Sequence, residues 1–251
     1  MTRAEEHTTS SIRRFHPSEA GVRLVCFPHA GGAASYFFRL SRQLSPVADV
    51  LAVQYPGRQE RRKEPCVGSV TGLADMLVAE LREWTDRPLA LFGHSMGALV
   101  GFEVARRLER EGIRPVTFFA SGRAAPSFSR DEGVHRRDDG ALIAKVRELG
   151  GTASGLLDDP DVAAMLLPAI RNDYRAVETY RHTPGPPLTC PLVVFTGDAD
   201  PQVSAEEARA WRAFSTGGFE LHTYSGGHFF LDAHAASVLE KIRAGLTAPA
   251  L

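Results

Sequence analysis

The chain has 251 residues, of which 43% are hydrophobic and 24% are charged, and its formal net charge is −1. This length and composition are typical of one globular α/β domain with a substantial core, so we expect a single domain over residues 1–251. The balanced charge gives no sign of a nucleic-acid partner or of binding to an anionic membrane.

The N-terminus and the cysteines predict the cellular location. The N-terminus is polar and lacks the apolar segment of a signal peptide, and no apolar run is long enough to span a bilayer. The 3 cysteines are an odd number and show no C-x-x-C spacing. We therefore predict a cytoplasmic protein without a disulfide framework and without a metal site.

The first part of the chain alternates predicted strands and helices. After a polar arm of about 20 residues, residues 22–27 predict a buried strand that runs into a loop of small residues, 28–35. A helix is predicted over residues 36–44 and a strand over residues 50–55. Ligands of an open α/β sheet bind at the carboxyl ends of its strands, so the loop of small residues lies where a site is expected.

A charged run and an amphipathic helix come next. Residues 58–63 have the sequence RQERRK, and the plainest interpretation of this basic turn is a solvated loop. The pattern over residues 70–84 predicts an amphipathic helix that leads into the following strand.

Residues 89–101 hold the strongest local signal. A short apolar strand is followed by the sequence GHSMG at residues 93–97, and then by a helical pattern with one apolar face. A G-x-S-x-G sequence between strand and helix is typical of the nucleophile elbow of α/β-hydrolases. The glycines permit a sharp turn that lifts the Ser95 hydroxyl clear of the sheet, beside a helix N-terminus. We identify Ser95 as the candidate nucleophile; the alternative is an ordinary helix-capping serine.

The alternation of strands and helices then stops. The predicted strand at residues 115–120 ends in SGR at 121–123, where some α/β-hydrolases place the catalytic acid, and no carboxylate lies there. Residues from about 126–186 predict a helical insertion, with helices over residues 140–149 and 161–180, that forms a lid over the strand ends. Its apolar residues could line an acyl pocket, but packing within the lid is the preferred interpretation. These residues are Met165, Leu166, Leu167, Ile170 and Tyr174.

The last two predicted strands supply an acid and a base. The strand over residues 192–196 is followed by Asp198 and Asp200, and the strand over residues 219–224 is followed by a Gly-Gly turn and His228. Serine, acid and histidine thus occur in the order of an α/β-hydrolase triad, each at the end of a predicted parallel strand. His228 is the preferred base because it follows the last strand behind a turn, ahead of a C-terminal helix.

Two assignments complete the candidate site. Asp198 and Asp200 share one loop, but the residue before Pro201 is held extended, which favours Asp200 as the acid and Asp198 as a turn former. An oxyanion hole needs one N–H from the loop after the first strand and one from the residue after the nucleophile, so we assign the backbone N–H groups of Ala30 and Met96.

Five motifs in chain order resemble those of the type II thioesterases, the free-standing editing enzymes of polyketide and nonribosomal peptide synthases. The motifs are FPHAGGA at 27–33, YPGR at 55–58, LFGHSMGA at 91–98, GDAD at 197–200 and GGHFF at 226–230. The resemblance covers nearly the whole chain. It implies an α/β-hydrolase fold, with a mostly parallel central sheet flanked by helices and a mobile lid. It also implies the catalytic triad and oxyanion donors: Ser95, Asp200, His228, Ala30 and Met96.

The resemblance further implies a serine thioesterase that removes aberrant or stalled acyl groups from the phosphopantetheine arm of acyl or peptidyl carrier proteins. That arm belongs to the partner, so the enzyme is expected to need no cofactor of its own. Carrier proteins of this kind are acidic, which suggests Arg58, Arg61 and Arg62 as a docking patch. A monomer without nucleic-acid or membrane partners is expected.

Three alternatives remain open at this point. Two are enzymes on the same fold: a medium-chain fatty acyl-carrier-protein thioesterase and a general carboxylesterase. The third is a carrier-protein-binding module with vestigial catalysis, which the intact triad disfavours. The sequence does not specify the acyl-chain preference or the biosynthetic pathway.

Overall fold

The computed structural model describes residues 11–151 and 155–247. At its centre lies a seven-stranded sheet in the order β1-β3-β2-β4-β5-β6-β7, in which all neighbouring strands are parallel except β1 and β3. The strands are β1 (Ile12–Arg13), β2 (Arg23–Phe27), β3 (Asp49–Val53), β4 (Leu89–His94), β5 (Phe118–Ser121), β6 (Leu192–Gly197) and β7 (Phe219–Tyr224). The predicted mostly parallel sheet is therefore confirmed.

The strand β1 corrects the expectation of an extended polar arm. Ile12 pairs with Val53 of β3 in antiparallel register, and Arg13 pairs with Ala52, so part of the arm is an edge strand. A strand of two residues is too short to give an alternating hydrophobic pattern, which is why the sequence does not predict it. Residues 1–10 of the predicted arm lie outside the described residues.

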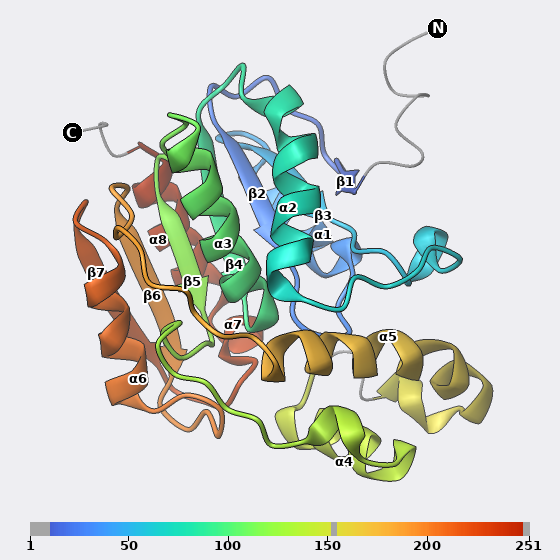
Figure 1. Ribbon diagram of the computed structural model, residues 1–251. Helices are drawn as coiled ribbons and strands as arrows, with labels where there is room; N and C mark the ends of the chain where they lie inside the picture. Colours follow the sequence, from blue (N-terminus) through green and yellow to red (C-terminus); the bar gives the residue numbers. More distant parts are fainter. Residues whose placement is uncertain (1–10, 152–154, 248–251) are drawn as a thin grey trace, which may run out of the picture.

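Helices cover both faces of the sheet (Figure 1). They are α1 (Phe38–Leu44), α2 (Val70–Leu81), α3 (Met96–Arg110), α4 (Asp139–Leu149), α5 (Pro160–Glu178), α6 (Ala205–Arg209), α7 (Phe230–Ala233) and α8 (Ala235–Thr247). Three of them differ from expectation. The predicted C-terminal helix is two helices, α7 and α8, and α6 is a five-residue helix that begins at the Ser204 capping box and is too short for a periodic signal.

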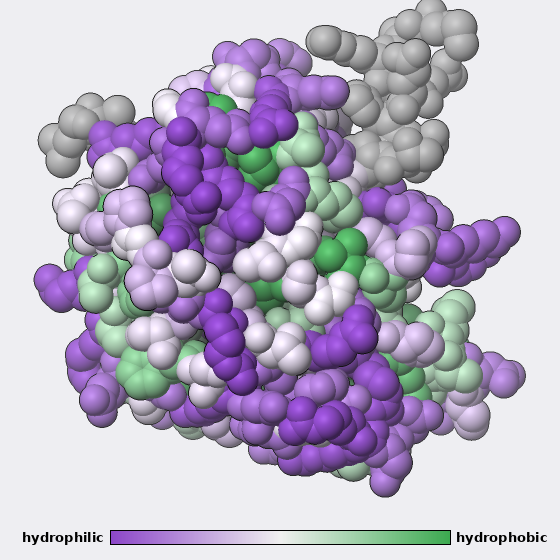
Figure 2. Space-filling view, in the orientation of Figure 1, coloured by the Kyte–Doolittle hydropathy of each residue, from purple (hydrophilic) through white to green (hydrophobic). Residues whose placement is uncertain are grey.

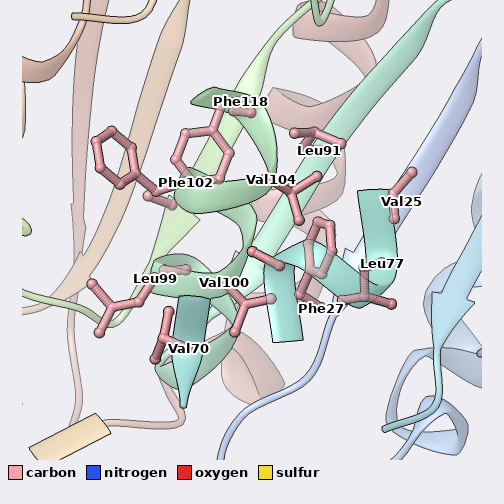
Figure 3. Packing of buried hydrophobic residues seen from close by; sticks show 14 of the residues in the cluster. Val25, Phe27, Val70, Leu77, Leu91, Leu99, Val100, Phe102, Val104 and Phe118 are labelled. Atoms are coloured by element: carbon pink, nitrogen blue, oxygen red, sulfur yellow. The ribbon is translucent and has the colours of Figure 1, made fainter. Parts of the chain in front are cut away.

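The core consists of two layers because successive side chains of a strand point to opposite faces. Val25 and Phe27 of β2 pack on one face against residues of α2 and α3, as Figure 3 shows for Leu77 and Val100. On the other face, the alternate β2 residues, including Leu24, pack in a second cluster with residues of α1 and α8. The two clusters fix the sheet, and hence the carboxyl ends of its strands.

The predicted lid region contains α4 and α5, joined in part by a 3₁₀ turn at Gly155–Asp158. Residues 152–154 of the predicted flexible segment lie outside the described residues. The lid has its own small apolar cluster, which includes Leu167 and Ile170, so internal packing is the correct interpretation for these two. Met165 instead is 57% exposed. The cluster's buried residues are Val134, Leu142, Leu157, Ala163, Leu167 and Ile170.

The surface is mainly hydrophilic on the face in view. Figure 2 shows hydrophobic residues scattered among hydrophilic ones on this face, without one broad apolar area. Among the described residues, no helix combines the length and the apolar character needed to cross a membrane.

Candidate active site

The turn between β4 and α3 holds Ser95 in a strained conformation. Its backbone angles are φ 56° and ψ −116°, a region that L side chains rarely adopt. Two glycines make this turn possible. A Cβ at Gly93 would lie 2.1 Å from the carbonyl oxygen of Gly97, and one at Gly97 would lie 2.0 Å from the carbonyl oxygen of Phe27. Close backbone packing therefore requires both glycines of the GHSMG sequence.

A chain of hydrogen bonds joins Ser95, His228 and Asp200. His228 Nε2 lies 2.9 Å from Ser95 Oγ, and His228 Nδ1 lies 2.8 Å from Asp200 Oδ2. A carboxylate only accepts hydrogen bonds, so Nδ1–H donates to Asp200 and Nε2 is left to accept from the serine hydroxyl. His228 is buried, and the Asp200 side chain is fully buried. The structure thus brings together the three residues that the sequence predicts.

The neighbouring Asp198 has a different position. Its Oδ1 accepts the N–H of Gly226 at 2.9 Å, and its side chain is exposed. Asp200 turns inward, where its second oxygen accepts the N–H of Gln202 at 2.8 Å. Asp198 therefore braces the turn that carries His228, while both oxygens of Asp200 are held in place beside the imidazole.

The two predicted oxyanion donors, Ala30 and Met96, follow two neighbouring strands, β2 and β4. Ala30 follows β2 and lines the same pocket as Ser95, and Met96 is the first residue of α3. Within the described ranges, neither backbone N–H donates to any acceptor. Both are therefore available for a negatively charged oxygen, at the positive end of a helix in the case of Met96.

A buried ion pair holds the loop that carries Ala30. Asp173 of α5 accepts the N–H of Gly31 at 2.8 Å through Oδ2. Both carboxylate oxygens of Asp173 also receive the Arg58 guanidinium, at 2.7 and 2.8 Å. Arg58 in turn donates to the carbonyl oxygen of Gly32 at 3.1 Å. One carboxylate on the lid helix thus fixes the loop next to the predicted oxyanion donor.

This pair corrects the hypothesis of a basic docking patch. Arg58 and Arg61 are 5% and 7% exposed, and Arg61 pairs with Glu64 at 2.6 Å. Only Arg62 of the three is exposed. A surface partner cannot reach two of the three guanidinium groups, so the charged run is mainly a structural turn.

Two further histidines, His29 and His94, lie beside the triad. Burial, and then the nearby His228, lower the pKa of His29 to about 3 and that of His94 well below its ordinary value. His94 Nδ1 lies 3.0 Å from Ser121 Oγ, and its ring lies 5.2 Å from that of His228. Both histidines are neutral at physiological pH, so they surround His228 without adding charge. Neither histidine is among the site residues predicted from the sequence.

A pocket opens over Ser95 between the strand ends and the lid. In Figure 1, α4 and α5 lie at the end of the molecule toward which the strands point. The pocket is bordered by Ala30, Ser95 and His228 on the sheet side. The lid side of the pocket has both apolar and charged residues. Tyr174 is one of them, which agrees with the alternative that apolar residues of the lid line an acyl pocket. These lid residues are Phe128, Arg130, Glu132, Val134, Lys145, Leu149, Tyr174, Val177 and Glu178.

One group of side chains has the composition of a cation site. Ligand atoms of Asp131, His135 and Glu178 lie within 4.8 Å of one another. Each is already engaged: Glu178 accepts the N–H of Val134 at 2.9 Å and pairs with His135, and Asp131 pairs with Arg136. We interpret this group as a network that holds the lid together.

Comparisons with known proteins agree with this architecture. A family profile described as a thioesterase domain matches residues 22–246. The chain is 52% identical over 224 residues to Thioesterase PikA5 of Streptomyces venezuelae, covering 88% of this chain and 80% of that protein. It is 49% identical over 247 residues to a probable cadicidin biosynthesis thioesterase of Streptomyces griseus, covering 98% of this chain and 68% of that protein.

Solved structures give the same result. The type II thioesterase BorB from the borrelidin biosynthetic cluster superimposes with a TM-score of 0.89 at 47% identity, over 94% of this chain and 97% of that chain. YbtT, a type II thioesterase from the yersiniabactin pathway, superimposes with a TM-score of 0.84 at 30% identity, over 94% of this chain and 98% of that chain. With its sheet order and flanking helices, the chain has the predicted α/β-hydrolase fold.

Proposed function

The chain belongs to the thioesterase family, as a type II thioesterase, and on that premise we propose that Ser95, His228 and Asp200 are its catalytic residues. The observation that carries this proposal is the continuous hydrogen-bond chain from Ser95 Oγ through His228 to Asp200, with distances of 2.9 and 2.8 Å. Serine needs an adjacent base at neutral pH, and this chain supplies one with its tautomer fixed.

The first half-reaction transfers the acyl group to the enzyme. Ser95 Oγ attacks the thioester carbonyl carbon while its proton moves to His228 Nε2, and Asp200 stabilises the imidazolium. The carbonyl oxygen becomes an oxyanion, which the N–H groups of Ala30 and Met96 stabilise. The C–S bond then breaks, the sulfur leaves as a thiolate and takes the proton from His228. A thiol is much more acidic than an alcohol, so the leaving group needs little assistance.

The second half-reaction hydrolyses the acyl-serine. His228 takes a proton from a water molecule, whose oxygen attacks the ester carbonyl. The tetrahedral intermediate uses the same two N–H groups. It collapses to a free carboxylic acid, and the proton on His228 returns to Ser95. Every proton is accounted for by His228, so we propose that the chain requires no cofactor of its own.

The substrate we propose is an acyl chain on the phosphopantetheine arm of an acyl or peptidyl carrier protein in polyketide or nonribosomal peptide synthesis. Support comes from relatives and solved structures that are named as thioesterases of biosynthetic clusters or pathways. Removal of aberrant or stalled chains is the corresponding physiological role. We further propose that the chain acts as a monomer in the cytoplasm.

The test compares substrates and variants in one panel. Acetyl-, propionyl- and longer acyl-carrier proteins, the matching small thioesters and a p-nitrophenyl ester are offered to the wild type and to Ser95→Ala. We expect thioester turnover to fall about 10⁴-fold or more in the variant, and to be faster on carrier protein than on small thioesters. Faster cleavage of the oxygen ester, with no effect of the carrier, indicates a general carboxylesterase. A marked preference for medium-length chains indicates a fatty acyl-carrier-protein thioesterase instead.

A further inference from the structure

The pocket over Ser95 contains an arginine without a partner. Arg123 follows β5, and its backbone is fixed because its carbonyl oxygen accepts the indole N–H of Trp211 at 2.7 Å. Its side chain lines the pocket together with Ser95 and His228. The side chain is half-buried, and within residues 11–151 and 155–247 its buried Nε has no hydrogen-bond partner. A buried polar group of this kind calls for an explanation.

The other charged groups of the pocket are all accounted for. Arg130 pairs with Glu207 at 2.5 Å and also donates to the carbonyl oxygen of Gln202 at 2.9 Å. Lys145 lies 3.2 Å from a carboxylate of Glu132 and equally far from one of Glu148. Glu178 accepts backbone N–H groups and pairs with a histidine of the lid. Arg123 therefore differs from its neighbours in the same pocket.

The charged groups around Arg123 do not provide its guanidinium with a partner. Burial, and then the charge of Arg130, lower the pKa of Arg123 to about 10, so the group remains protonated at neutral pH. Asp200 is close enough to act on this charge, but its two oxygens are occupied by His228 and the N–H of Gln202. A half-buried guanidinium whose Nε has no acceptor gains from any oxygen that enters the pocket.

The location of Arg123 is close to the reacting centre. Gly122 precedes it in a left-handed conformation with φ +58°, and a Cβ at Gly122 would lie 3.6 Å from His228 Cε1. Arg123 thus follows a residue whose backbone faces the imidazole, and its side chain lines the same pocket as Ser95. An acyl group bound to Ser95 extends into this pocket.

Building on the proposed thioesterase function, we propose that Arg123 is a specificity-determining residue that donates hydrogen bonds to an oxygen on the acyl chain near the thioester. The preferred substrates are then oxygenated acyl thioesters, whose acceptor is a ketone or a carboxylate, rather than plain alkyl chains of equal length. A guanidinium binds either acceptor, and a carboxylate in a bidentate manner.

The test uses three pantetheine thioesters of nearly equal length: butanoyl, 3-oxobutanoyl and malonyl. Their kcat/KM values are measured with the full chain and with Arg123→Met, which keeps the aliphatic length but removes the donors. Since the three carbonyls differ in intrinsic reactivity, the quantity of interest is the change from wild type to variant. We expect kcat/KM to fall about 10- to 100-fold more for an oxygenated substrate than for butanoyl. A selective fall for malonyl alone identifies a carboxylate, and one for 3-oxobutanoyl identifies a neutral carbonyl.

Two controls keep the result interpretable. Arg130→Met removes a paired arginine from the same pocket, and we expect it to leave the ratio between substrates unchanged. The ratio within one variant is also independent of the fraction of protein that is folded, so partial unfolding of Arg123→Met does not alter it. Arg123→Lys, which keeps the charge, should restore part of any malonyl preference.

The outcomes separate this proposal from the one it rests on. An equal fall for all three substrates, or no fall, overturns the role of Arg123, because a contact with the pantetheine amides or with the protein affects every substrate alike. If Ser95→Ala hydrolyses butanoyl-pantetheine as fast as the wild type, the thioesterase mechanism fails instead. Ser95-dependent hydrolysis without Arg123-dependent selectivity leaves the proposed function intact.

Discussion

Replacing Asp173 by asparagine should separate the stability of this protein from its activity. The Asp173 side chain is 1% exposed and binds both the Arg58 guanidinium and the N–H of Gly31. Asparagine has the same shape but no charge, and one of its two terminal atoms can no longer accept a hydrogen bond. The variant leaves a buried guanidinium without its counterion, which costs about 3–5 kcal/mol of unfolding free energy.

The effect on catalysis has a different origin. Gly31 adjoins Ala30, and without its carboxylate acceptor the loop no longer holds the Ala30 N–H in one position. Loss of one oxyanion donor lowers kcat by about 10²–10³-fold, which sets the upper limit for Asp173→Asn. Because the defect concerns the transition state, we expect kcat to fall by about 10-fold or more while KM for a small thioester changes little.

The assay combines denaturant unfolding with steady-state kinetics on a small acyl thioester. A double variant, Arg58→Met with Asp173→Leu, replaces the pair by apolar side chains and should recover stability, since such replacements are often neutral or stabilising. It should not recover kcat, because the Gly31 N–H still lacks its acceptor. The matched control is Asp49→Asn, which disrupts a fully buried carboxylate paired with Arg14 at the other end of the strands.

The control should lose stability and keep the kcat of the folded protein. Wild-type kcat in Asp173→Asn would refute the reasoning, because it would mean that the loop holds the oxyanion donor without the carboxylate. Recovery of both stability and kcat in the double variant would refute it as well, since the charge pair alone would then explain the defect.

Three other predictions concern the site and its surroundings. Asp200→Asn should lower kcat about 10⁴-fold, whereas Asp198→Asn, on the exposed carboxylate, should change it about twofold or less; equal losses in thioester turnover would contradict the assignment. Gly97→Ala places a Cβ 2.0 Å from a backbone oxygen and should lower the unfolding temperature by more than 10 °C or prevent folding, while Gly21→Ala, with open space, should not; thermal denaturation of both decides this. Because burial and His228 hold the pKa of His29 at about 3, the unfolded chain binds a proton that the native state does not, and this histidine alone should lower the unfolding free energy by about 1.4 kcal/mol per pH unit from about pH 6 to 3. His29→Asn should reduce that slope in denaturant titrations at several pH values, and parallel curves for the two proteins would be the contrary result.

The parts of the site that can be predicted from the sequence are those marked by a local sequence pattern. Ser95 lies in a turn whose glycines are visible in the sequence, and His228 and Asp200 each directly follow a strand. Their meeting follows from the parallel order of the strands, which brings the carboxyl ends to one edge. The structure adds the distances and the inward turn of Asp200, whose side chain is buried against His228.

The parts that sequence analysis misses depend on distant contacts. Arg58 stands in a run of charges, which usually forms a solvated loop, and its partner Asp173 is 115 residues away. The pair forms only when α5 packs over the sheet, and no local pattern reveals it. The same holds for His94 and Arg123, whose chemical environments result from burial that the sequence does not display.

The helix α5 supplies side chains to two separate cores. Near its first turns, Ala163 and Leu167 belong to the small lid cluster, whereas Ala176 near its end belongs to the main cluster of the sheet, and Asp173 lies between the two. Substitutions that reshape the lid cluster therefore leave the packing of the sheet intact. Because one helix joins the two clusters, the cover of the substrate pocket can be altered by substitutions in its first turns while the packing that holds Ser95 is kept.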